Sequence, residues 1–251
     1  MATQRFSAPD ISPATPPGRY HGYAIATGIL LLGMFSVASA NWGETVATPP
    51  DALVAAQERA AVSGDDELAL SALEQLRSGN PENAVYSYMI AGHYARRHEW
   101  QPAIAALDRG NKATRLRLAE SATSTGSYPA LPVLRQLVTR CTEEATRRSD
   151  ETGESLLRES GILASRLARE ATPCDLPVLQ NAGSAWQTVE RARIAVWERD
   201  ERFPDAEAAR ARLATRKKWW QHVNEQTARV DIADTAIREQ VALQLRQEIG
   251  D

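Results

Sequence analysis

The histidines are the first residues to test for chemistry. His98-Glu99 begins like the HExxH motif, in which two histidines four residues apart bind zinc from one helix face. Pro102 stands where the second histidine would be, so the motif is incomplete. His93 lies five residues before His98 and does not share its helix face. The sequence therefore predicts no metal site.

The two cysteines are the next candidates. Cys141 and Cys174 are too few for a zinc site unless histidine joins them, and no histidine lies near either residue. In an oxidising compartment such a pair is a candidate disulfide. The alternative is two buried thiols that pack as small hydrophobic side chains. We expect the disulfide if this part of the chain is exported.

Motifs that carry catalysis are missing from the sequence. It contains no GxSxG, Walker or GxGxxG pattern. Acidic clusters occur at 65–67 and 143–144, where they are typical of a helix N-terminus and a solvated helix face. We expect a protein with no catalytic residues and no cofactor. A lytic or hydrolytic enzyme is the alternative, and it requires a deep pocket with converging carboxylates.

A cluster of basic and aromatic residues covers positions 216–220. Tryptophan beside lysine suits a lipid interface or a partner anchor, so Lys217, Lys218 and Trp219 are possible partner or lipid contacts. Helical spacing places Trp220 on the core side and Trp219 elsewhere on the helix. We therefore expect Trp219 to be the exposed tryptophan.

The elements that position these residues are expected to be helices. Ala, Leu, Glu, Arg and Gln, which favour helices, are abundant after residue 51, and Val and Ile never alternate as in a strand. The composition, with 43% hydrophobic and 24% charged residues, is that of a globular protein. The formal net charge of −3 argues against nucleic-acid binding. The fold class predicted is all-α.

An uncharged apolar stretch at residues 20–42 is predicted to be a transmembrane helix. Tyr23 to Trp42 is 20 residues, which as a helix spans about 30 Å, the hydrocarbon thickness of a bilayer. Aromatic residues flank both ends, as they do at membrane interfaces. The side chains expected to anchor it in the bilayer are Tyr20, Tyr23, Leu30, Leu31, Leu32, Phe35 and Trp42.

The charges around this stretch predict its orientation. Arg5 and Arg19 precede it and Glu44 follows, which places a Ser/Pro-rich tail (1–19) in the cytoplasm. A linker (43–50) and the remaining chain then lie in the periplasm, at a bacterial inner membrane. The alternative is a signal peptide cleaved after Ala40, because residues 38–40 read Ala-Ser-Ala.

Helices are expected throughout the exported part. Residues 51–122 should form a first group, in which a helix starting near Trp100 continues through 112–122. Residues 129–251 should form helical hairpins. The helices expected there include 154–171, 175–201, 205–225 and 226–249, preceded by one with an apolar stripe of Leu131, Leu134, Val138, Cys141 and Ala145.

Residues 84–117 resemble a tetratricopeptide repeat (TPR), a pair of packed helices. With Ala84 as the first position, small residues fall where the two helices cross, and Tyr94 and Leu107 take bulky positions. The small residues are Ala91, Ala103 and Gly110. The pattern departs at Ser87, at His98 in place of the turn glycine, and at Arg115 in place of proline.

The resemblance implies a helical surface that binds peptides or protein subunits, without assigning contact residues. Stacked helix pairs form such surfaces and carry no chemistry of their own. We therefore expect a membrane-anchored, non-catalytic scaffold. Its partners would be the lipid bilayer and the subunits of a larger membrane complex, for example a photosynthetic or respiratory assembly. A soluble periplasmic binding or assembly factor is the alternative.

Overall fold

The computed structural model describes residues 66–119, 126–231 and 233–249. Within these ranges the regular structure is helical, with two isolated β-bridges and no strand, which confirms the all-α prediction. The helices are α3 (Asp66–Gly79), α4 (Ala84–Arg96), α5 (Trp100–Lys112), α6 (Ala130–Arg147), α7 (Glu151–Arg169), α8 (Leu176–Arg199), α9 (Phe203–Arg229) and α10 (Thr235–Gln247).

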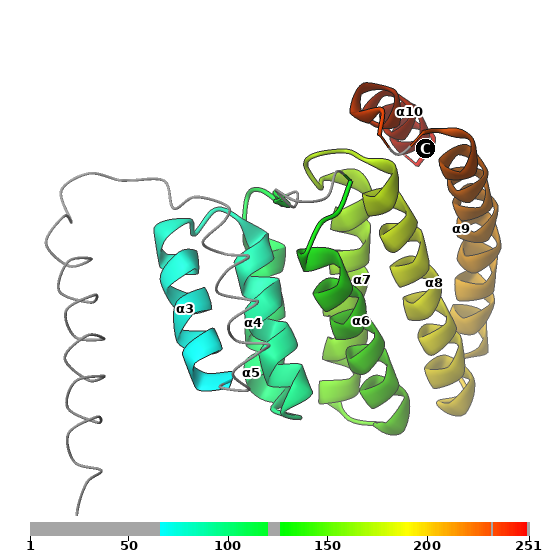
Figure 1. Ribbon diagram of the computed structural model, residues 1–251. Coiled ribbons are helices and arrows are strands. Elements are labelled where there is room, and N and C mark those ends of the chain that lie inside the picture. Colours follow the sequence, from blue (N-terminus) through cyan, green and yellow to red (C-terminus); the bar gives the residue numbers. More distant parts are fainter. Residues whose placement is uncertain (1–65, 120–125, 232, 250–251) are drawn as a thin grey trace, which may run out of the picture. The chain divides into compact units, whose positions relative to one another are not determined.

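Two layers of helices make up most of this body (Figure 1). Helices α4, α6 and α8 contact one another in succession and form one layer, while α5 and α7 contact each other in the second. Helices that follow each other in the sequence also pack together, as α4 with α5, α6 with α7, and α8 with α9. Helix α3 packs on α4, and α10 packs on α8 and α9.

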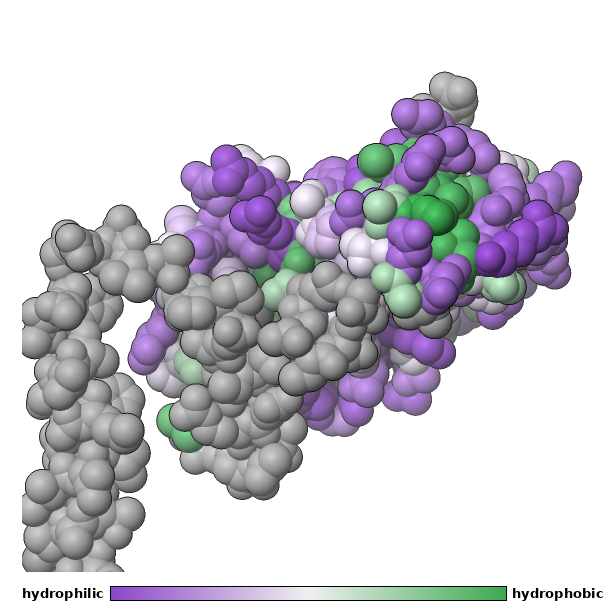
Figure 2. Space-filling model, turned by 45° about the horizontal axis from the view of Figure 1, so that its top comes forward, coloured by the Kyte–Doolittle hydropathy of each residue, from purple (hydrophilic) through white to green (hydrophobic). Residues whose placement is uncertain are grey.

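The apolar stripe predicted for residues 131–145 faces the core. Leu134, Val138, Cys141 and Ala145 are at most 1% exposed, and all belong to one cluster of buried side chains from α3 to α8. Hydrophilic residues cover most of the described face in Figure 2, and the hydrophobic colouring gathers toward the C-terminal half of the body. The helices thus use the faces that their periodicity predicts.

The small residues of the 84–117 segment lie where α4 and α5 cross. Ala91 and Ala103 are fully buried. A Cβ atom on Gly110 would stand 2.5 Å from the ring of Tyr88, well inside van der Waals contact. The two backbones can approach because these side chains are small or absent. This agrees with the packing reason given for the pattern.

Helix α5 ends at Lys112, so the helix expected over 112–122 is wrong for the described residues 113–119. These residues form an extended segment, called the strap here. Leu116 and Leu118 are 2% and 3% exposed, and the arginines before each of them are exposed. This alternation is the period of an extended chain.

The strap forms backbone hydrogen bonds with two separate turns. Ala84 N donates to Arg115 O at 2.8 Å, and Arg115 N donates to Glu82 O at 3.0 Å, just before and at the start of α4. Leu118 N donates to Thr172 O at 2.7 Å, in the turn between α7 and α8. The strap therefore joins the start of α4 to the start of α8.

Several helix boundaries differ from those expected, because capping side chains lie at other positions. Helix α7 begins at Glu151 rather than 154, since the Asp150 side chain accepts a hydrogen bond from Gly153 N at 3.1 Å. Helix α9 continues through Arg229, beyond the expected end at 225. The last helix starts at Thr235 because Asp234 caps it, accepting from Ile237 N at 3.1 Å.

The expected membrane span at residues 20–42 lies outside the described residues, as do residues 51–65 of the first expected helical group. None of the helices between residues 66 and 249 that the structure describes has both the length and the apolar character that a bilayer crossing requires.

Candidate functional site

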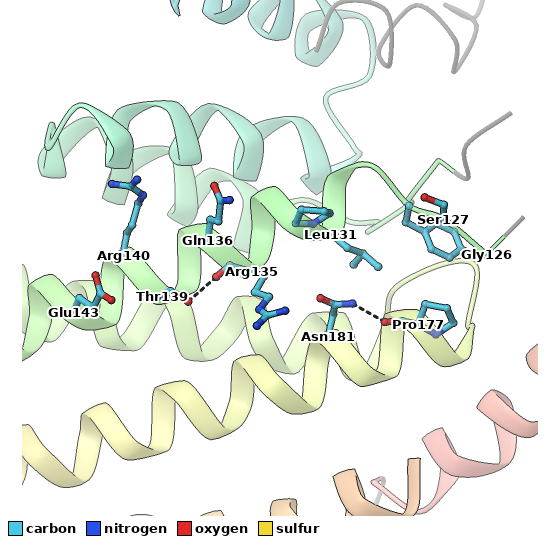
Figure 3. Close-up of a pocket in the computed structure, with 12 residues that line it drawn as sticks. Gly126, Ser127, Leu131, Arg135, Gln136, Thr139, Arg140, Glu143, Pro177 and Asn181 are labelled. Carbon is cyan, nitrogen blue, oxygen red and sulfur yellow. Dashed lines mark hydrogen bonds between the residues drawn. The ribbon is translucent and has the colours of Figure 1, made fainter. Parts of the chain in front are cut away.

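An open groove of about 880 Å³ runs along α6 and the first turns of α8 (Figure 3). Its apolar lining comes from Tyr128, Leu131, Pro132 and Pro177. Tyr128 and Leu131 are each 4% exposed, so they are fixed in the core and present only their edges. Proline in the first turn of each helix is expected, since those backbone N–H groups lack helical partners.

The polar lining of the groove comes mainly from α6. Arg135, Gln136, Thr139 and Arg140 stand on its outer side. In Figure 3 the side chains of Gln136 and Arg140 extend to one side of α6, and Arg135 extends to the other side, toward Asn181 of α8. Two guanidinium groups therefore stand on opposite sides of the α6 axis.

Among the described residues, neither guanidinium group has an anionic partner. Most arginines near carboxylates in this body form ion pairs, as Arg148 does with Glu144 at 2.6 Å. Arg135 and Arg140 form no ion pair with any described residue, and Arg140 is half-buried. A guanidinium that is partly desolvated and unpaired favours an anion from outside.

One end of the groove is fixed by a buried ion pair. The hydroxyl of Tyr128 donates to Asp175 Oδ2 at 2.8 Å, and Arg238 of α10 donates to both carboxylate oxygens, each at 3.0 Å. Gly126 has φ +72° and lies against that guanidinium: a Cβ atom there would be 3.2 Å from Arg238 Cζ. Helix α10 thus holds residues 126–128 against the start of α8.

The groove is suited to a chain segment rather than to a small molecule. It is open to solvent, whereas small-molecule pockets enclose most of their ligand. Glu143 is the single carboxylate among the residues that line it, so no two carboxylates converge there. An open, cationic groove with an apolar base fits an extended polypeptide that offers acidic side chains.

A second charged cluster, between α8 and α9, is explained by packing. Glu190 is fully buried and accepts from Arg193 at 3.0 Å, from Arg212 at 3.1 and 3.2 Å, and from Arg216. The guanidinium of Arg216 also lies 4.6 Å from the centre of the Trp186 ring. These contacts join α8 to α9, and burial lowers the pKa of Arg216.

The disulfide expected between Cys141 and Cys174 is not formed. Both residues are free, buried thiols. Cys141 belongs to the main core cluster, and Cys174 to a smaller cluster with residues of α8, α9 and α10. Burial raises the pKa of the Cys141 thiol to about 12 and raises that of Cys174 as well. The alternative interpretation, two thiols used as hydrophobic packing, describes them.

In the basic–aromatic cluster at 216–220, the exposure of the side chains differs from the prediction. Lys217 and Lys218 are exposed and stay available to a partner. Trp219 was expected to be exposed, but it is half-buried: its ring lies 5.5 Å from that of Trp186, and its Nε1 donates to Leu245 O at 2.9 Å. Trp220 is also half-buried and donates to Gln180 O at 3.1 Å.

The histidines of the described body do not gather with other ligands. Across residues 66–119, 126–231 and 233–249, no three His, Cys, Asp or Glu side chains are placed to hold a metal ion. His98 has φ +58° in the turn between α4 and α5, the left-handed conformation that glycine adopts most easily. Its position thus explains why the repeat pattern has glycine there.

Comparison of the chain with protein-family models finds no matching family, and comparisons with curated proteins and with solved structures find no significant match.

The groove was missed by sequence reasoning because its parts are far apart in the chain. The lining comes from residues 126–143 and 177–181, which α7 separates in the sequence and which come together only in the folded chain. One local signal was present: Arg135, on the face of α6 opposite the apolar stripe, has no acidic residue three or four positions away.

Proposed function

We propose that this protein is a membrane-anchored helical scaffold, a non-catalytic accessory subunit of a larger membrane protein complex on the periplasmic face of a bacterial inner membrane. A photosynthetic or respiratory assembly is one example. The observation that carries the proposal is the groove along α6 and α8: an open surface, built on a layer of stacked helices, with two guanidinium groups that form no ion pair with a described residue. Such surfaces suit protein ligands.

A TPR-like arrangement is part of this proposal. Support comes from the layers, in which α4, α6 and α8 succeed one another and α5 and α7 lie in the other layer. Further support comes from the buried small residues Ala91, Ala103 and Gly110 at the crossing of α4 and α5. The strap is a departure from the pattern, since Arg115 pairs with the start of α4 where a proline would end the unit.

The tether is proposed from the sequence of residues 20–42. Its apolar length, aromatic ends and flanking charges favour a single membrane span with the N-terminus in the cytoplasm. A binding protein without its own chemistry acts where it is held. The tether would therefore concentrate the groove near the complex that it serves.

The second candidate is a soluble periplasmic binding or assembly factor, favoured by the Ala-Ser-Ala sequence at 38–40. Intact-mass measurement of the protein from its native membranes separates the two. A mass that includes residues 1–40 supports the anchor, and a mass that lacks them leaves the soluble factor. An enzyme gains no support from the groove, where Glu143 has no second carboxylate to work with.

Mild-detergent purification followed by native mass spectrometry tests the scaffold. The expected result is a complex of fixed stoichiometry with other membrane subunits. The matched control is the chain from Gly43 onward, exported behind an unrelated cleavable signal, which should lose most of the co-purifying partner. Purification of the full chain alone as a monomer would contradict the proposal.

A further inference from the structure

The residues that line the groove carry a net positive charge. Arg135 and Arg140 contribute two positive charges, and Glu143, the last residue of α6 in the lining, contributes one negative charge. The whole chain has a formal net charge of −3, so this local surplus has the opposite sign to the chain as a whole. Arg140 is half-buried and forms no ion pair with a described residue, so an anionic ligand would stabilise its charge.

The length of the groove limits what can fill it. From Leu131 to Glu143 it follows α6 for 12 residues, which is about 18 Å at 1.5 Å per residue. An extended chain rises about 3.3 Å per residue, so roughly five or six residues fit. Arg135 and Arg140 are about 7.5 Å apart along the axis and extend to opposite sides of α6. Side chains of an extended chain alternate sides, so two of them three positions apart suit this arrangement.

The remaining lining suits the backbone of such a segment. Gln136 forms no hydrogen bond with a described residue, so its amide can both donate and accept. Asn181 donates to Pro177 O at 2.8 Å and keeps its carbonyl oxygen as an acceptor for a peptide N–H. The edges of Tyr128 and Leu131 provide apolar contact between these polar positions.

We infer that the groove binds an extended, acidic segment of a partner protein, with two carboxylates three positions apart that reach Arg135 on one side of α6 and Arg140 on the other. This inference rests on the proposed scaffold function and names the chemistry of its partner. Glu143 sets the direction of the preference along the groove, because it repels acidic side chains at the end where it stands. Arg140 is three residues before Glu143, so the segment carries its second carboxylate at Arg140 and no acidic residue beyond it.

Selection from a library of random six-residue peptides tests the inference, using the full chain in lipid nanodiscs as bait. The wild-type chain should enrich peptides with two acidic residues three positions apart. Enriched peptides are resynthesised, and their affinity is measured by fluorescence anisotropy at two salt concentrations. Binding should weaken as salt rises, since it depends on partly exposed charges.

Substitutions of the lining residues test whether the peptides bind in the groove. Arg135→Gln with Arg140→Gln should weaken the resynthesised peptides about tenfold. The matched control is Arg109→Gln with Arg229→Gln, which removes the same charge from exposed positions of α5 and α9 that do not line the groove, and should leave the affinity within about twofold. Glu143→Gln should strengthen binding about twofold to threefold, a gain that misfolding cannot imitate.

Several outcomes would overturn the inference: enrichment of neutral or basic peptides, no enrichment over the Arg135→Gln, Arg140→Gln variant, or equal losses in the control variant. Equal losses would indicate general electrostatic attraction rather than a site. Any of these leaves the scaffold proposal intact if the chain still co-purifies with membrane subunits. Conversely, a monomeric chain that binds acidic peptides in the groove would contradict only the scaffold.

Discussion

Arg238 and Asp175 form a bidentate ion pair in which the side chains are 2% and 0% exposed. They are 63 residues apart and join α10 to the residue that caps α8. Tyr128 donates to the same carboxylate, so one buried group holds three parts of the chain together. A pair this deep is costly to break from either side, because the remaining charge stays buried.

Removal of one member of this pair should be strongly destabilising. Arg238→Ala should lower the free energy of unfolding by about 3–5 kcal/mol, since it leaves the Asp175 carboxylate buried without its cation. Urea denaturation followed by circular dichroism measures the loss. The double variant Arg238→Met with Asp175→Asn should lose less than the sum of the single variants. A loss under about 1 kcal/mol for Arg238→Ala would show that the pair is solvated.

Gly110 should tolerate no side chain. Gly110→Ala places a Cβ atom 2.5 Å from the ring of Tyr88, so we expect α4 and α5 to move apart at a cost of about 1–3 kcal/mol in thermal or urea unfolding. Gly79→Ala is the control, because a Cβ atom there meets nothing within 4 Å. That variant should change stability by less than about 1 kcal/mol. Equal effects at both positions would contradict the packing argument.

The thiols should be inert in the folded protein. The pKa of Cys141 is raised to about 12, so the reactive thiolate is scarce at any pH below that value. At about pH 8, a thiol reagent should label the native chain at least about a hundredfold more slowly than the chain in guanidinium chloride. Unfolding without reductant should release two reactive thiols. Release of none would indicate the disulfide instead.

Among the residues between α8 and α9, Glu190 should be the one whose substitution lowers the free energy of unfolding most. Glu190→Gln leaves the guanidinium groups of Arg193, Arg212 and Arg216 together without their shared carboxylate, so a loss of about 3 kcal/mol is expected. Glu207→Gln is the control, since Glu207 forms an exposed pair with Arg210. Its effect in the same denaturation assay should stay below about 1 kcal/mol. Similar losses would mean that the cluster is solvated.

The sequence predicted what depends on local periodicity. The buried stripe of α6 and the small residues between α4 and α5 follow from helical spacing, and the structure places them as expected. The strap was missed because its residues favour helices, yet its buried Leu116 and Leu118 alternate with exposed arginines. That two-residue period was the available signal.

Features that depend on long-range contacts were out of reach. The pair of Asp175 and Arg238 and the groove between α6 and α8 require the arrangement of the helices, which spacing alone does not give. The prediction that Trp219 is exposed was also wrong for this reason. Its half-buried state depends on α10, whose carbonyl at Leu245 accepts the indole N–H.

The strap also limits where further helix pairs could be added to this body. Arrays whose units contact only their neighbours can gain or lose a unit and keep their surface. Here one short segment hydrogen-bonds to the start of α4 and to the turn before α8, so the distance between those points is fixed. An extra helix pair inserted between them would break one set of these bonds. The number of helix pairs in this region is therefore constrained, and new units can be accommodated only outside it.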